Sequence, residues 1–134
     1  MTKTIRRASS WYALACAIVL GVTLHAGVAC AQQQDTKPYD DRLTRLSEIL
    51  GAVHYLRELC GNNDGQVWRD RMRELIDTEG TTAARRAKLT KSFNDGYRSY
   101  SRTYQSCTPT AQVAINRFLT EGAQIADTLV TTVP

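Results

Sequence analysis

The feature that most constrains this chain is a set of apolar side chains that recur every three or four residues between positions 43 and 60. This spacing places them on one face of an α-helix, where a second element can bury them together. Asp40 or Asp41 would cap the start of the helix, and Gly61 would end it. The apolar positions are Leu43, Leu46, Ile49, Leu50, Val53, Leu56 and Cys60.

Three further segments carry the same helical periodicity, and only short connections separate them. None shows the alternation of a strand. Each start is marked by turn or capping residues, which are the turn at 61–65, Thr81 with Thr82, and Thr108 followed by Pro109. The predicted fold is therefore all-α, a small antiparallel four-helix bundle over residues 39–130.

The first 31 residues have the features of a cleaved signal peptide. Basic residues precede an apolar stretch at 11–24, and Ala29 and Ala31 are small residues of the kind that a signal peptidase needs. We expect a polar, disordered segment at 32–38 and a periplasmic mature protein. Lipidation of Cys30 is the alternative, and only then would a membrane hold the chain.

Loss of the leader leaves two cysteines, Cys60 and Cys107. In an oxidising compartment an even pair predicts one disulfide. A nucleophilic Cys60 would need a nearby base, and His54 lies on a different face of the same helix. Cys60 and Cys107 end the first and third helices, which run the same way in an antiparallel bundle. The two cysteines should then meet at one end and staple the fold.

The charge balance argues against nucleic acid as a partner. Removal of three basic leader residues leaves fourteen basic side chains against thirteen acidic ones. A nearly neutral chain lacks the concentrated positive field that nucleic acid requires.

Candidate sites for chemistry are few. Asn62, Asp64 and Gly65 resemble the middle of a calcium loop, but Cys60 and Arg71 occupy the positions where ligands are needed. No metal or cofactor site is predicted. The segment 93–104 carries four aromatic residues on one helical stripe, which we expect in the core, and His54 is expected at the core's edge. Gly96 in that segment indicates close helix packing or a small concavity.

The sequence resembles an uncharacterised family of small exported alphaproteobacterial proteins, classed as a domain of unknown function. The motifs that carry the resemblance are GAVHYLRELCG at 51–61, VWRDRM at 67–72, FNDGYRSY at 93–100, the ending at 104–107 and Gly122. The resemblance implies export and a pair of separated cysteines matching Cys60 and Cys107. It implies no activity, cofactor or partner.

These observations favour a binding or adaptor module of the cell envelope, without catalytic activity, whose partner is an envelope protein or another envelope component. An enzyme with a polar site around His54, Tyr97 and Arg98 is the first alternative, and a structural envelope protein is the second. The predicted contact residues are Trp68, Arg69, Arg73, Asn94, Tyr97 and Arg98.

Overall fold

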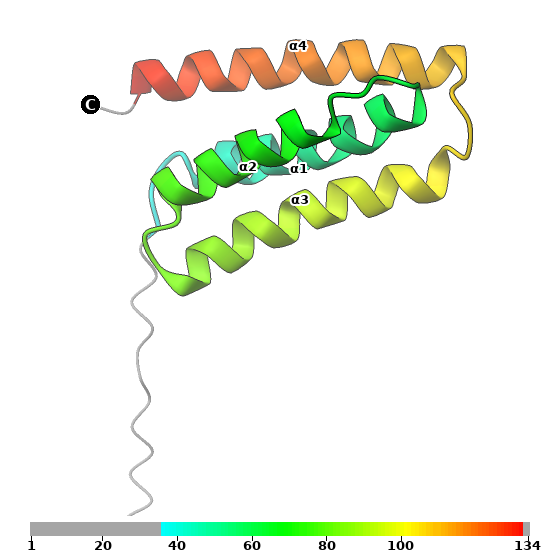
Figure 1. Ribbon diagram of the computed structural model, residues 1–134. Coiled ribbons are helices and arrows are strands. Elements are labelled where there is room, and N and C mark those ends of the chain that lie inside the picture. Colours follow the sequence, from blue (N-terminus) through cyan, green and yellow to red (C-terminus); the bar gives the residue numbers. More distant parts are fainter. Residues whose placement is uncertain (1–35, 133–134) are drawn as a thin grey trace, which may run out of the picture. The chain divides into compact units, whose positions relative to one another are not determined.

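The computed structural model describes residues 36–132 and shows four α-helices and no strand among them. Figure 1 shows the chain turning back after each helix, with the ends of α1 and α3 on the same side. The predicted helical segments are confirmed to within a few residues. Their bounds are α1 Asp40–Leu59, α2 Gly65–Glu79, α3 Ala83–Thr103 and α4 Pro109–Thr132.

Local chemistry explains where the helices begin and end. The hydroxyl of Thr82 accepts a hydrogen bond from the Arg85 amide, and that of Thr108 accepts one from the Ala111 amide, both at 3.1 Å. Gly61 has a φ of 78°, which lets the chain turn out of α1. At the start of α1 the expected cap differs: Asp40 is the first helical residue, and its carboxylate accepts from the Lys37 amide instead.

Helix α1 lies at the centre of the described domain and packs against the other three helices. Within residues 36–132, α4 approaches the backbone of α1 alone, although the ring of Tyr100 on α3 also meets Phe118 edge-on at 5.0 Å. Two buried clusters result. One comprises Ile49, Ala52, Val53, Leu56, Ala111, Ile115 and Phe118, and the other comprises Leu43, Leu50, Met72, Leu89 and Leu129.

A second buried face of α1 is made of small and polar residues and contacts α3. Ser47, Gly51 and His54 are all buried on it. A Cβ added at Gly51 would overlap the Phe93 carbonyl, and one added at Gly96 would overlap the Glu48 carbonyl. Gly96 therefore serves close helix packing, one of the two roles that its sequence position indicated.

The predicted disulfide is confirmed. Cys60, directly after α1, is bonded to Cys107, with their Cα atoms 4.8 Å apart. Cys107 was expected to end the third helix, but α3 ends at Thr103, and Cys107 lies in the loop before α4. The bond ties the start of α4 to the end of α1, the helix against which α4 packs.

The fold also buries one arginine, Arg85. Its side chain is buried, forms ion pairs with Asp40 and Glu79, and lies over the ring of Tyr39. This network joins the starts of α1 and α3 to the end of α2, so Arg85 is a structural residue.

Candidate functional site: a groove between two helices

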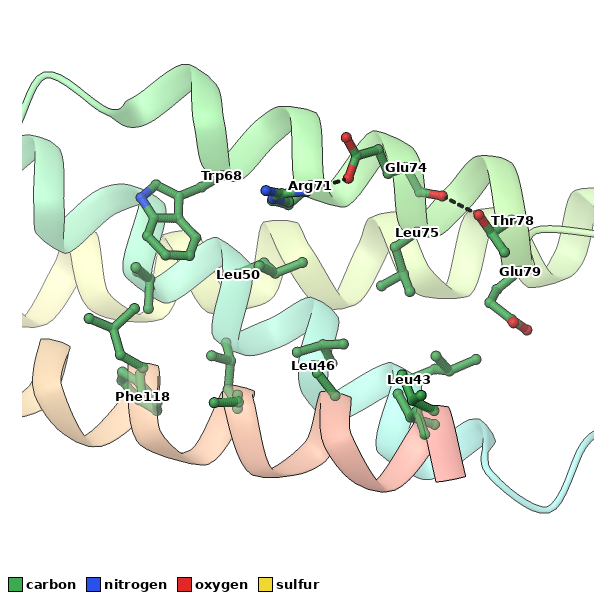
Figure 2. Close-up of a pocket in the computed structure, with 18 of the residues that line it drawn as sticks. Leu43, Leu46, Leu50, Trp68, Arg71, Glu74, Leu75, Thr78, Glu79 and Phe118 are labelled. Carbon is green, nitrogen blue, oxygen red and sulfur yellow. Dashed lines mark hydrogen bonds and ion pairs between the residues drawn. The ribbon is translucent and has the colours of Figure 1, made fainter. Parts of the chain in front are cut away.

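An apolar groove of about 620 Å³ runs between α2 and α4, and α1 forms its floor. Figure 2 shows Leu43, Leu46 and Leu50 on the floor, with Trp68 and Leu75 on the α2 side. The groove exists because α2 and α4, both within the described domain, each pack on α1 and make no close backbone approach to one another. Its volume lies in the range of natural ligand sites.

The two walls differ in chemistry. The α2 wall has a polar upper edge, where Arg71 and Glu74 form an exposed ion pair at 3.0 Å. The α4 wall contains small residues, which are Gly122, Ala123 and Ala126. Small side chains let the backbone of a neighbouring element come close. The groove therefore has an aliphatic floor and one polar edge, and the small residues of its α4 wall would let the backbone of a bound segment come close.

The length of the groove and the charged residues around it limit what it can hold. It follows α1 from Tyr39 to Val53, which corresponds to about 20 Å at the rise of a helix. The segments that form it are 39–53, 68–79 and 118–132, and together they carry nine acidic and five basic side chains. Among the lining residues the charged side chains are Arg71, Glu74 and Glu79; the first two pair with each other, and Glu79 pairs with Lys37 and Arg85.

His54 lies behind this groove, in the contact of α1 with α2 and α3. It is 0% exposed, and its Nε2 accepts a hydrogen bond of 2.8 Å from Arg69. Its ring is 5.9 Å from that of Phe93 and 5.4 Å from that of Tyr97. Burial lowers the pKa of His54, and the charge of Arg69 lowers it further, against the opposing effect of Glu58. The expectation that His54 lies at the edge of the core is wrong.

The residues of the proposed enzyme site do not form an open polar site. Tyr97 meets His54 ring to ring, yet the enclosed imidazole has no exposed surface for a substrate. Arg98 is exposed on α3, and none of its described contacts reaches His54. A buried histidine that accepts a bond from arginine is a packing and positioning group here.

The predicted contact residues lie in different parts of the domain. Trp68 lines the groove, Arg69 binds His54, and Arg73 is exposed with a 2.8 Å ion pair to Asp70. Asn94 and Tyr97 are half-buried on α3. Among the six, only Trp68 contributes to the groove.

Sequence reasoning missed the groove itself, because Gly122, Ala123 and Ala126 in its α4 wall carry no chemical signal. A spacing signal was present, since Leu119, Ala123, Ala126 and Val130 continue along one side of α4 beside its buried face.

Two other kinds of site are not formed by the described residues, a metal centre and a membrane span. No group of three or more His, Cys, Asp or Glu side chains within 36–132 is arranged to hold a metal ion. No helix in that same range has the length and apolar character needed to cross a membrane.

Comparison with known proteins gives a family and no function. Neither the curated proteins nor the solved structures include a match to this chain. A family model described as "Protein of unknown function (DUF2385)" matches residues 38–132, which cover all four helices. The chain therefore belongs to this family, whose function has no assignment.

Proposed function

We propose that the protein is an exported, non-catalytic binding module that holds an amphipathic helix of a partner protein in the groove between α2 and α4. The observation that carries the proposal is the open apolar groove over α1. The proposal keeps the antiparallel bundle expected from the sequence and opens it on one side. A partner helix between α2 and α4 would give α4, which packs on α1 alone among the described helices, a second helical neighbour.

The openness of the groove favours a helix over a free acyl chain. Because α2 and α4 stay apart along the groove, an occupant keeps one side in water. An amphipathic helix suits this arrangement, since its apolar stripe enters the groove and its polar face remains solvated. A length of about 20 Å accommodates three to four turns, or anchors at i, i+3, i+4 and i+7.

The charges define the partner further. Glu74 is an exposed acidic side chain on the edge of the groove, so a helix with Lys or Arg on its polar flank can pair with it. Glu74 and Arg71 are each more than half exposed, and their pair can be exchanged for contacts with the partner.

Export is part of the proposal. Its support is the leader-like sequence at 1–31, which lies outside the described residues, together with the Cys60–Cys107 disulfide, which is typical of an oxidising compartment. A periplasmic protein or other envelope component is then the natural source of the partner helix.

Methyl NMR of the chain from Gln32 onward tests the site with two defined probes. The first is an amphipathic peptide of Leu and Lys, four turns long, and the second is monomeric dodecylphosphocholine. We expect the peptide to shift the methyl signals of Leu46, Leu50 and Leu119 saturably. Val113, which is 65% exposed on α4 outside the groove, should not move.

Two tryptophan variants provide the matched control. Ala123→Trp fills the α4 wall and should block the peptide, whereas Val113→Trp adds the same ring elsewhere on α4 and should not. If dodecylphosphocholine bound and the peptide did not, the proposal of a partner helix would be wrong, and the groove would be a site for acyl chains. If neither probe shifts the groove methyls more than Val113, the groove is not the binding site.

A further inference from the structure

The outer face of α3 carries a straight row of basic side chains. Lys88, Lys91, Arg98 and Arg102 are all exposed and are spaced three, seven and four residues apart. At 3.6 residues per turn these positions fall on one helical face, and from Lys88 to Arg102 the row is about 21 Å long. Asp95, spaced four residues after Lys91, lies on the same face.

The positive charge of this row is largely unneutralised. Lys91 pairs with Asp95 at 2.5 Å, while Lys88, Arg98 and Arg102 have no acidic partner among residues 36–132. Helix α3 holds six basic residues and one acidic residue, and the rest of the described chain holds eight basic and eleven acidic. A protein that is nearly neutral as a whole therefore has a polarised surface.

The opposite side of α3 is occupied by α1. Gly96 is buried there, and the two backbones are in direct contact through it. Lys88, Arg98 and Arg102 make no contact with α1, α2 or α4 among the described side-chain interactions, so the fold does not use their charge.

From this arrangement we propose that the outer face of α3 binds the surface of a membrane rich in anionic phospholipid headgroups. A flat sheet of phosphates can meet a straight, exposed row along its whole length, and each basic residue adds to the attraction. The row has no exposed large apolar side chain within it, since those of the described domain are Val67, Val113 and Val130 on α2 and α4. Binding is therefore electrostatic and peripheral, without insertion.

Membrane binding through α3 is independent of the groove, because the row and the groove use different helices. Helices α2 and α4 would remain accessible to a partner while α3 lies on the headgroups.

Vesicle sedimentation at low salt tests the proposal, with the chain from Gln32 onward and vesicles of phosphatidylcholine alone or mixed equally with phosphatidylglycerol. We expect binding to the mixed vesicles only, weakening as salt is raised. Lys88→Glu with Arg102→Glu should lower the affinity at least about tenfold. The control, Arg42→Glu with Arg73→Glu, makes the same change of net charge on exposed sites of α1 and α2 and should lower it no more than about threefold.

Circular dichroism establishes that both variants keep their helices, and Lys88→Gln with Arg102→Gln provides a milder pair if the reversals do not. Equal losses in both charge variants would show that net charge, and not the row, governs binding. Equal binding to both vesicle types would overturn the proposal. So would tight binding of duplex DNA by a protein that does not sediment with anionic vesicles.

Discussion

The contact of α1 with α3 and the groove between α2 and α4 show two ways in which helices of one small domain meet. In the first, glycines at 51 and 96 bring two backbones together, and no side chain could be added without displacing a carbonyl. In the second, α2 and α4 share α1 as a floor and leave an apolar channel between them. The first contact is closed and specifies the fold, whereas the second has room for a further element.

The largest expected loss of stability comes from adding a methyl group to the α1–α3 contact, where there is no space for it. Gly96→Ala should lower the free energy of unfolding by about 3 kcal/mol, because the new Cβ meets the Glu48 backbone, which cannot move independently. Chemical denaturation followed by circular dichroism measures this. A loss below about 1 kcal/mol would mean that the two helices can separate at little cost.

Removal of the disulfide should have the next largest effect. Cys60→Ala with Cys107→Ala is expected to cost about 2–4 kcal/mol, the usual range for a loop of this size. Because the bond anchors the start of α4, amide exchange should rise more in α4 than in α3. Equal increases in amide exchange in α3 and α4 would contradict the view that α4, which packs on fewer helices, depends more on the disulfide.

The pH dependence of stability probes the α1–α2–α3 contact around His54. Its pKa is lowered in the folded protein, chiefly by burial, so the unfolded chain binds the proton more readily. Stability should be full above pH about 6.5 and fall as the pH drops toward the folded pKa, by about 1.4 kcal/mol per unit of depression.

His54→Gln should remove this dependence between pH 7 and 5. The carboxyl of Glu121, whose pKa is lowered by its hydrogen bonds from Arg45, contributes only at lower pH, through loss of a stabilising ion pair. A variant that kept the wild-type slope between pH 7 and 5 would show that another group titrates there.

The smallest effect is expected on the open side. Gly122→Ala places a Cβ 3.4 Å from Ile49 Cγ2, an ordinary contact, and it improves helix propensity. We expect a gain of up to about 1 kcal/mol in the same denaturation experiment used for Gly96→Ala. A loss similar to that of Gly96→Ala would mean that both sides of the molecule are equally closed.

The sequence predicted the local features of the fold, but it did not predict how the polar face of α1 is buried. The four helices, the Thr82 and Thr108 caps and the disulfide follow from local patterns that act within a few residues or from cysteine pairing. The burial of His54 does not, because α1 has two buried faces and only one is apolar. The face toward α3 is made of Ser47, Gly51 and His54. Because these residues are small or polar, hydrophobic periodicity predicts that they are exposed.

The candidate site was predicted only in part. Trp68 was expected in a contact surface, and it lines the groove. Arg98 was also named as a contact residue, and it belongs to the basic row of α3. The groove depends on the distance between α2 and α4, which no local pattern encodes. The basic row of α3 was not predicted, because its lack of acidic partners depends on how the helices pack. In the fold, Asp70 and Glu74 pair within α2, and Glu79 pairs with the buried Arg85.

Amide hydrogen exchange with and without the amphipathic Leu and Lys peptide tests the contrast most directly. In the free protein, α1 and α3 should be the most protected and α4 the least. The peptide should then raise protection along α2 and α4 and leave α3 unchanged. If α3 exchanged as fast as α4, or if protection rose only on α3, the assignment of one closed side and one receptive side would be contradicted.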